Sequence, residues 1–253
     1  MRWFVIILLL ASCGRINFEK LAIVEDDGAI AGQDGAGAID ADKGTTVDAA
    51  GLPSGLVFNF SFDEGLPTVD STGAHPANCT ACPTPIDGRV GEGAFFDGTQ
   101  CLFIPDSPAL RSTDFTFAAW VKPTNIDGTG VVYGRPLDSD VGNLNTREIY
   151  IRPTGTWNVG INAVLLSSTT PQAINEWHHI AGVLEGGVLR MYFDGINGGF
   201  TGSQAPLYSD EEDTIGCDLD SAALNSFFVG RLDEVQLYNR ALTAAEIAAL
   251  PGL

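Results

Sequence analysis

Positive charge is scarce in this sequence. Its 253 residues include 13 Lys and Arg against 32 Asp and Glu, which gives a formal net charge of −19 at pH 7. Such a chain repels phosphate groups, so nucleic acids and anionic lipid headgroups are poor partners. An acidic surface suits neutral ligands and cations, although its simplest explanation is a solvated face without a specific role. The hydrophobic content of 45% is sufficient for a packed core.

The apolar run at the N-terminus is short. Residues 1–3 carry one positive charge, and residues 4–11 are too few to span a bilayer as a permanent helix. The run ends in Leu10-Ala11-Ser12-Cys13, which resembles the lipobox of bacterial lipoproteins. The resemblance implies a signal peptide over residues 1–12 and a palmitate-bearing Cys13 that anchors the exported chain in the bacterial cell envelope, on the periplasmic or the surface side of the outer membrane. The alternative is a standard secretory signal with a chance cysteine.

Four cysteines remain after Cys13, an even number in an oxidising compartment, so two disulfides are expected. Three pairings are possible. We favour Cys79–Cys82 and Cys101–Cys217, because the first two lie close together in a turn-rich segment and the other two each border an apolar run. Zinc is disfavoured because a second close cysteine pair is missing and the three histidines add no ligand spacing.

Residues 13–54 have almost no aromatic side chains and little apolar periodicity. Ala, Gly and Asp dominate this segment, which cannot bury enough surface to offset its ordering entropy. We predict a flexible acidic linker. As a random coil it would span about 35 Å and hold a folded domain of residues 55–253 away from the membrane.

Period-2 alternation dominates the remainder of the chain. It is clearest over residues 56–62, 115–121 and 157–161, where every second residue is apolar. Two further apolar runs flank Gly186-Gly187, which is typical of a hairpin turn. Residues 227–238 supply the last strands. The pattern predicts an all-β fold, an antiparallel sandwich of two sheets, and no repeat of fixed period suggests a propeller or a solenoid.

One short helix is expected at the C-terminus. Thr243 and Glu246 form a capping box, in which the two side chains satisfy free backbone N–H groups. The helix would run from Ala244 to Leu250 and stop at Pro251.

Six segments between residues 56 and 250 occur in a recognisable order. They are Phe62-Asp63-Glu64-Gly65 followed by Asp70-Ser71-Thr72-Gly73, Gly88-Arg89-Val90-Gly91-Glu92-Gly93-Ala94-Phe95-Phe96-Asp97-Gly98, Phe115-Thr116-Phe117-Ala118-Ala119-Trp120-Val121-Lys122-Pro123, Trp177-His178-His179-Ile180-Ala181-Gly182-Val183, Tyr192-Phe193-Asp194-Gly195, and Gly230-Arg231-Leu232-Asp233-Glu234-Val235 with Tyr238-Asn239-Arg240-Ala241-Leu242. Together they resemble the laminin G-like jelly roll of the concanavalin A-like lectin and glucanase superfamily. The resemblance implies two stacked antiparallel sheets, one of them concave, in a recognition or adhesion module for glycans or proteins.

Catalytic carboxylates are not evident. Relatives that hydrolyse β-glucans carry a Glu-x-Asp-x-x-Glu pattern on one strand, and no strand here has it. Asp233 and Glu234 are adjacent on a strand and should face opposite ways, as should His178 and His179, of which one would pack and one would be exposed. Acids on neighbouring strands can still converge, and Asp97 with Asp233 is the pair to watch. We therefore predict no enzymatic activity.

Calcium is the one cofactor that the resemblance implies. Asp63, Asp70, Asp97 and Asp233 are the carboxylates in matching segments, and calcium takes several oxygen ligands, backbone carbonyls included. The alternative is that these Asp side chains cap turns.

Ligand contacts are expected at polar loops. Residues 134–147 are predicted to form a long polar, Gly-rich loop of the kind that often carries recognition. The candidate ligand-binding side chains lie in or near loop ends and are Tyr133, Arg135, Arg152, Trp157 and Tyr208. The sequence thus predicts a membrane-anchored, non-catalytic lipoprotein that binds a glycan or a protein. A diverged glycoside hydrolase and a structural envelope protein are the alternatives.

Overall fold

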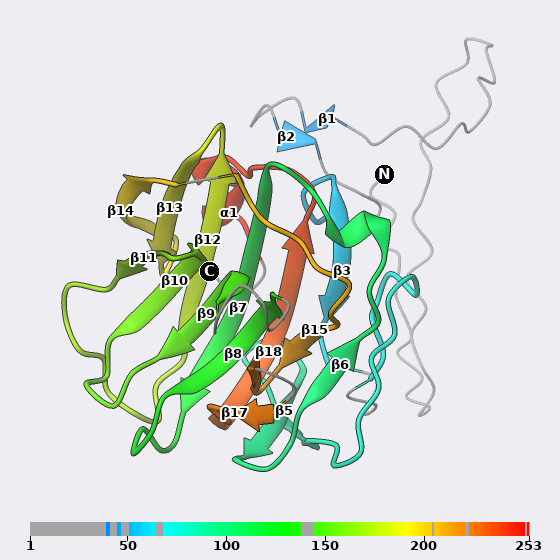
Figure 1. Cartoon of the computed structure of the whole chain (residues 1–253), viewed down its shortest axis with the longest axis vertical. Helices are drawn as coiled ribbons and strands as arrows, with labels where there is room; N and C mark the ends of the chain where they lie inside the picture. Colours follow the sequence, from blue (N-terminus) through cyan, green and yellow to red (C-terminus); the bar gives the residue numbers. More distant parts are fainter. Residues whose placement is uncertain are drawn as a thin grey trace, which may run out of the picture. The chain divides into compact units, whose positions relative to one another are not determined.

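The computed structural model describes residues 39–40, 45–46, 51–63, 68–137, 144–203, 205–220, 223–250 and 252 (Figure 1). The predicted signal peptide, Cys13 and most of the predicted linker lie outside these residues. The chain divides into two units, Met1–Ala36 and Gly37–Leu253, and every residue described here belongs to the second. Among the described residues no helix is both long and apolar enough to cross a membrane.

Two antiparallel sheets form the fold. The six-stranded sheet has the order β11-β10-β9-β8-β15-β6, and the eight-stranded sheet has the order β14-β13-β12-β7-β18-β5-β4 with β3 paired to β18. The strands of the first sheet are β6 (Leu102–Ile104), β8 (Gly130–Pro136), β9 (Asn145–Ile151), β10 (Trp157–Asn162), β11 (Val164–Ser167) and β15 (Asp213–Ile215). Those of the second are β3 (Leu56–Phe60), β4 (Thr84–Asp87), β5 (Glu92–Asp97), β7 (Phe115–Pro123), β12 (His178–Glu185), β13 (Val188–Phe193), β14 (Ile196–Gly202) and β18 (Val229–Tyr238).

The smaller elements are two short strand pairs and two helices. Strand β1 (Ile39–Asp40) pairs with β2 (Thr45–Thr46), and β16 (Asp218–Asp220) pairs with β17 (Ala223–Asn225). A 3-10 helix, η1, covers Pro108–Leu110, and the helix α1 covers Ala244–Ala248. The predicted all-β sandwich with one short C-terminal helix is therefore confirmed.

The main core lies between the two sheets, which stack as two layers in Figure 1. Alternation explains its composition. Phe115, Phe117, Ala119 and Val121 of β7 face inward from one sheet, and Trp157 of β10 faces inward from the other. Burial of these side chains supplies most of the driving force for the sandwich, at about 25 cal/mol for each Å² of apolar surface.

Local turn chemistry fixes the hairpins of the eight-stranded sheet. Gly186 and Gly187 both have positive φ, at 53° and 76°, and connect β12 to β13 in register Glu185 opposite Val188. Asp194 and Gly195, at 48° and 76°, connect β13 to β14 in the same way. Two successive positive φ values define the turn whose twist matches paired strands, so both turns set strand register.

The helix α1 covers the outer face of the eight-stranded sheet. Its capping box forms as predicted, with the Thr243 hydroxyl accepting from the backbone N–H of Glu246 and the Glu246 carboxylate accepting from the N–H of Thr243. Ile247 and Leu250 then pack with Tyr238 in a second apolar cluster.

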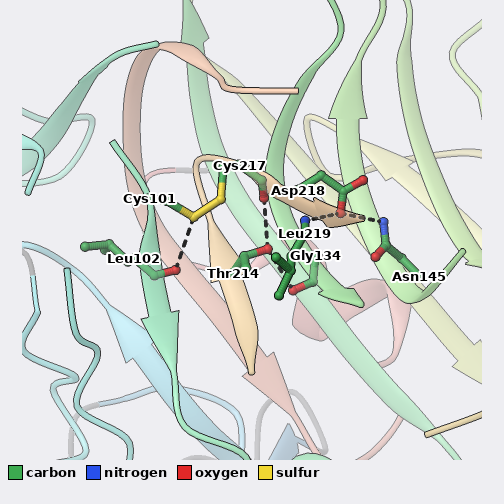
Figure 2. Close-up of a disulfide and its surroundings, with 8 residues drawn as sticks. All are labelled: Cys101, Leu102, Gly134, Asn145, Thr214, Cys217, Asp218 and Leu219. Carbon is green, nitrogen blue, oxygen red and sulfur yellow. Dashed lines mark hydrogen bonds between the residues drawn. A yellow bond between two sulfur atoms is a disulfide. The ribbon is translucent and has the colours of Figure 1, made fainter. Parts of the chain in front are cut away.

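Both favoured disulfides are confirmed, Cys79–Cys82 and Cys101–Cys217. The second joins residues 116 apart in the sequence, beside the paired strands β6 and β15 (Figure 2). Both of its cysteines are buried. By restricting the unfolded chain, closure of a loop of this length stabilises the fold by about 4 kcal/mol.

Candidate functional site

A groove lies on the outer face of the six-stranded sheet, opposite the core. Its volume is about 330 Å³. Its lining comes from strands β8, β9 and β10, the β10–β11 hairpin, and the β16–β17 region. The lining residues are Thr129, Val131, Leu144, Glu148, Tyr150, Asn162, Ala163, Leu165, Asp218 and Ser226.

Strand alternation explains why polar side chains reach this groove. On β9, Ile149 and Ile151 point into the core, so Glu148 and Tyr150 point outward. Gly160 lies opposite Glu148 on β10, and a Cβ at that position would come within 2.7 Å of Glu148 Oε1. Glycine at position 160 therefore leaves the room that the Glu148 side chain occupies.

Two carboxylates meet at the groove. The Asn145 Nδ2 group donates to Glu148 Oε2 and to Asp218 Oδ1, each at 3.1 Å. Because both oxygens bind the same nitrogen, they lie within about 6 Å of each other. Asp218 follows the buried Cys217, and its Oδ1 also accepts from the backbone N–H of Leu219 at 2.9 Å (Figure 2). The Cys101–Cys217 disulfide thus holds one wall of the groove.

The groove carboxylates are compensated only in part, because the hydrogen bond from Asn145 and the charge of Arg152 oppose the effects of burial and like charge on the pKa of Glu148. Burial raises the pKa of Glu148 to about 7, and the charges of Asp218 and Asp220 act in the same direction. Burial also raises the pKa of Asp218, with Asp220 adding to the effect. Asn145 is 4% exposed, and its Oδ1 has no hydrogen-bond partner among the residues that the structure describes. Among the groove-lining residues, Glu148 and Asp218 therefore offer carboxylate oxygens to a ligand with hydrogen-bond donors, whereas Asn145 does not line the groove.

The inner face of the same sheet carries a balanced charge network. Asp213 forms ion pairs with Arg135 and with Arg147, the latter at 2.8 Å, and all three side chains are fully buried. Arg147 Nε donates to the Tyr133 hydroxyl at 2.7 Å, and the hydroxyl donates to Asp213. Burial raises the pKa of Tyr133 well above its usual range, so the phenol stays protonated. Arg135 also binds Asp106, at 2.6 Å.

This network accounts for three of the predicted ligand-binding residues. Tyr133 and Arg135 are core members of it, and the Tyr208 ring lies 5.4 Å from the Arg135 guanidinium while its hydroxyl donates to Ser112. Trp157 is fully buried between the sheets. Ligand contact does not fit Tyr133, Arg135 or Trp157, because they expose almost no surface to solvent.

Arg152 alone remains beside the groove. It is exposed, and its guanidinium donates to the Tyr150 hydroxyl at 3.0 Å. The predicted loop over residues 134–147 is shorter than expected, because β8 continues to Pro136 and β9 begins at Asn145. Residues 138–143 within it lie outside the described residues.

The four predicted calcium ligands separate into two groups. Asp70 accepts from the backbone N–H groups of Asn59, Thr72, Ala74 and His75, so it caps a turn. Asp97 accepts from Thr99 and likewise caps a turn. For these two, the geometry is that of the turn-capping alternative.

Asp63 and Asp233 instead approach one turn over residues 88–92. Asp63 Oδ1 accepts from the N–H of Glu92 at 2.8 Å, and Asp233 Oδ2 accepts from the N–H groups of Arg89 and Val90 at 2.7 and 2.8 Å. Asp233 is fully buried, yet its Oδ1 has no hydrogen-bond partner in the described part of the chain. Burial raises the pKa of Asp233 to about 7, and the charge of Glu234 contributes.

This turn partly fits a calcium ion. A free buried carboxylate oxygen beside a second carboxylate is what such an ion requires, together with backbone carbonyls. Gly91, at φ 60°, leaves room for Asp63, because a Cβ there would lie 2.0 Å from Asp63 Oδ1. Among the residues described, no three His, Cys, Asp or Glu side chains gather as a metal-binding group.

Asp97 and Asp233 do not converge. Asp97 lies opposite Val229 on β18, four positions from Asp233, which is about 13 Å along a strand. The two histidines also differ from expectation, because both are buried. His178 Nδ1 lies 3.0 Å from Asp194, and burial lowers the pKa of His179 to about 4.

Comparison with known proteins adds the family and the fold. A laminin G family model described as the concanavalin A-like lectin/glucanases superfamily matches residues 96–248. No curated protein sequence matches the chain.

Among solved structures, domain 4 of AbnA, a GH43 extracellular arabinanase from Geobacillus stearothermophilus in complex with arabinotriose, is similar with a TM-score of 0.62 and 20% identity. The match covers 77% of this chain and 97% of that domain. The binding domain of Paraclostridial Mosquitocidal Protein 1 has a TM-score of 0.62 and 14% identity, over 78% of this chain and 51% of that one. Trypanosoma rangeli sialidase in complex with sialic acid has a TM-score of 0.61 and 18% identity, over 81% of this chain and 35% of the sialidase. At such identities these likenesses show the fold alone.

Proposed function

This chain belongs to the concanavalin A-like lectin/glucanases superfamily, and from that premise we propose that its jelly-roll domain binds a carbohydrate in the groove on the six-stranded sheet. The observation that carries the proposal is the groove itself, which places the carboxylates of Glu148 and Asp218 beside the apolar side chain of Leu165 and the ring of Tyr150. Sugar hydroxyls donate hydrogen bonds to such groups. Leu165, which is 40% exposed, and Tyr150, which is largely buried, line the groove and add apolar contact for the sugar ring.

The similar structures support this choice of ligand class. The arabinanase domain, which this fold covers almost completely, is recorded with arabinotriose, and the sialidase with sialic acid. The proposal takes from them only the class of ligand, a carbohydrate.

Hydrolysis is the second candidate, and one observation favours it. Glu148 and Asp218 approach within about 6 Å, close to the separation of the two carboxyl groups in retaining glycosidases. Those enzymes keep one carboxyl protonated and the other ionised, so their environments push the two pKa values apart. Burial raises the pKa of Glu148 to about 7 and also raises the pKa of Asp218, and these two shifts do not by themselves assign an acid and a nucleophile. No strand carries the Glu-x-Asp-x-x-Glu pattern of the relatives that hydrolyse β-glucans. We therefore propose binding without turnover.

One experiment separates the two candidates. The purified full chain is incubated with arabinan, β-glucans, galactans and host-type glycans, and both retention and new reducing ends are measured. We expect retention without new reducing ends, and we expect Asp218→Asn to weaken retention. New reducing ends that vanish in Asp218→Asn would establish a hydrolase instead. Retention of no glycan would refute the proposal and favour a structural role.

We also propose that Cys13 anchors the domain in the bacterial cell envelope. The support is the lipobox-like segment before Cys13 and the acidic, Ala/Gly/Asp-rich segment after it. Several acyl chains are needed for a firm attachment, and a lipidated N-terminal cysteine supplies them. Cells that express Cys13→Ala should no longer incorporate labelled palmitate into the protein. Unchanged labelling of the variant would show that the lipid is attached elsewhere, and an unlabelled parent would show that the protein carries no such lipid.

A structural calcium at the turn over residues 88–92 is a separate proposal, with Asp63 and Asp233 as the ligating carboxylates. Bound calcium would neutralise two acids that otherwise lie against backbone groups of one turn. A ligand of the folded state stabilises it by mass action, so EDTA should lower the melting temperature and added calcium should restore it. An Asp97→Asn control should respond to EDTA as the parent does, whereas Asp233→Asn should not respond. A parent melting temperature that ignores EDTA would contradict the proposal.

A further inference from the structure

The charge of this chain is distributed unevenly along its sequence. Residues 153–175 and 195–209 contain no Asp, Glu, Lys or Arg, in a chain whose formal net charge is −19. These two segments include β11 and β14, the end strands of the two sheets, which lie near each other (Figure 1). The segments are also joined by a hydrogen bond, because Asn162 Nδ2 donates to the carbonyl of Ala205 at 3.0 Å. We call the surface that the two segments form the uncharged side.

The uncharged side also collects exposed apolar side chains. Six large apolar side chains are exposed in the described part of the chain, and five of them belong to these two segments. The five are Leu165, Ile174, Ile196, Phe200 and Leu207, and the sixth is Leu224. Exposed apolar side chains that gather on one surface mark an interaction site.

The end strand β11 lacks the features that usually prevent a sheet edge from pairing with another strand, namely charge, proline or a bulge. At the far end of the eight-stranded sheet, β4 contains Pro85 and Asp87, and the pairing of β14 with β13 is interrupted by a register shift. In contrast, β11 has the sequence Val-Leu-Leu-Ser and pairs with β10 without a shift. Among the described strands β10 is its only partner, so one row of its backbone N–H and C=O groups points away from the sheet.

An edge of this kind is suited to another β-strand. Backbone N–H and C=O groups need hydrogen-bond partners, and the hydrocarbon of a bilayer supplies none. Charge indicates which strand fits. Two copies of a chain with a net charge of −19 repel each other over most of their surfaces, and on the uncharged side they can meet without bringing like charges into contact.

The strand β11 is also complementary to itself. Val164 and Leu166 lie opposite core residues of β10 and face the core side of the sheet, whereas Leu165 faces outward. In an antiparallel pair, directly opposite residues lie on the same side of the sheet. A two-fold axis at Leu165 therefore places Leu165 opposite its own counterpart, and Val164 opposite Leu166 at two positions. All three cross-strand pairs are apolar, and such pairs stabilise a sheet.

We propose that two copies of this chain associate through β11, antiparallel about a two-fold axis at Leu165, so that their six-stranded sheets form one continuous sheet. The same surface of each copy makes the contact, and the dimer is closed. This inference does not depend on the proposed carbohydrate binding. If both hold, the two grooves lie beside the shared edge, because Asn162, Ala163 and Leu165 line each groove, and the pair can engage a repeating glycan at two points.

The test measures the mass of the purified full chain without glycan, by light scattering over micromolar to millimolar protein concentrations. We expect a mass that approaches twice the monomer mass of 26.7 kDa as the concentration rises. Leu165→Lys should stay monomeric, because it places like charges directly opposite each other. The control is Leu224→Lys, since Leu224 is 41% exposed and Leu165 is 40% exposed, and Leu224 lies outside the uncharged side. This control should dimerise as the parent does.

A mixing experiment tests the position of the two-fold axis. Leu165→Lys and Leu165→Glu should each be monomeric alone. A one-to-one mixture should form the dimer again, because opposite charges then face each other across the axis. Melting curves of the two variants confirm that they are folded.

Three results would overturn the inference. The first is a parent that keeps the monomer mass at every concentration. The second is a dimer that persists in Leu165→Lys, because its contact must lie outside β11. The third is a pair of folded variants that do not associate on mixing. A monomeric parent that sediments with vesicles of phosphatidylcholine, when Leu165→Lys does not, would assign the uncharged side to a membrane instead. Carbohydrate binding is measured separately by the retention assay, so either proposal can fail alone.

Discussion

The two faces of the six-stranded sheet differ in how their charged side chains are paired. On the inner face, Asp213 is matched by Arg135 and Arg147, and every member of that trio is fully buried. On the outer face, Glu148 and Asp218 share the Asn145 amide, and within the described part of the chain neither forms an ion pair, although the charge of Arg152 lies near Glu148. Adjacent residues of β9 belong to the two sets, since Arg147 points inward and Glu148 outward.

The difference separates a structural from a functional use of charge. An ion placed in a core must be paired, because the loss of one partner leaves an uncompensated charge. A groove open to solvent does not need internal pairing, and it can keep acceptors for a ligand. The balanced set therefore explains stability, and the unbalanced set marks the candidate site.

The strongest test of this contrast is a matched pair of substitutions. Asp213→Asn should destabilise the protein by about 3–5 kcal/mol, because it leaves two buried arginines short of a counter-charge. Asp218→Asn should leave stability nearly unchanged and weaken glycan binding. Denaturant unfolding at neutral pH measures the stability of the two variants, and the retention assay measures their glycan binding. Equal losses of stability in the two variants would contradict the claim that the charges on the inner face stabilise the fold and those on the outer face do not.

The next largest effect concerns the Cys101–Cys217 disulfide, whose second cysteine directly precedes Asp218. Replacing Cys101 and Cys217 together by Ser should lower the unfolding free energy by about 2–4 kcal/mol. It should also weaken glycan binding, because Asp218 directly follows Cys217. The matched control replaces Cys79 and Cys82, which close a loop of only three residues in sequence separation, and should cost less and leave binding intact. A control as damaging as the first variant would contradict the account.

The smallest effect is a pH-dependent one at Glu148. Burial raises its pKa from the ordinary value of 4.5 to about 7. Below pH 4.5 the Glu148 carboxyl is protonated in both the folded and the unfolded state, so its raised pKa does not lower the free energy of unfolding. As pH rises from about 4.5 to about 7 the unfolded state loses its proton first, so the folded state is progressively disfavoured.

Glu148→Gln removes that cost. The variant should be more stable than the parent by about 1–2 kcal/mol at pH 8, a value reduced from the full shift because the groove is open to solvent, and equally stable at pH 4. Melting temperatures across this pH range provide the check. A variant that is less stable than the parent at pH 8 would mean that the Glu148 carboxylate is compensated in the groove.

The fold was largely predictable from local patterns. Alternation at residues 115–121 and 157–161 identified core-facing strands, Gly186-Gly187 identified a hairpin, and Thr243 with Glu246 identified the helix start. Each of these signals depends on residues close together in the sequence. The Cys101–Cys217 pairing followed from their positions beside apolar runs.

The groove could not be predicted, because its residues come together only through long-range pairing. Glu148 and Asp218 are 70 positions apart, and Asn145 bridges them only once β15 pairs with β8 and β8 with β9. A hint exists in Glu148, an acid with buried positions on either side of it in the strand β9. The prediction of Tyr133 and Arg135 as ligand-binding residues failed for the same reason. Their partner Asp213 lies about 80 residues away in the sequence, and both side chains are buried beside it.

The most direct test of the central claim is to locate the bound sugar. Backbone amide chemical shifts of the isotopically labelled protein are recorded during titration with the tightest-binding oligosaccharide of the panel. The account predicts that the shifts which change cluster at β9, at the β10–β11 hairpin and at Asp218, with Asn145 among the largest. Saturable binding whose shift changes fall instead on the eight-stranded sheet, or on the turn over residues 88–92, would contradict it.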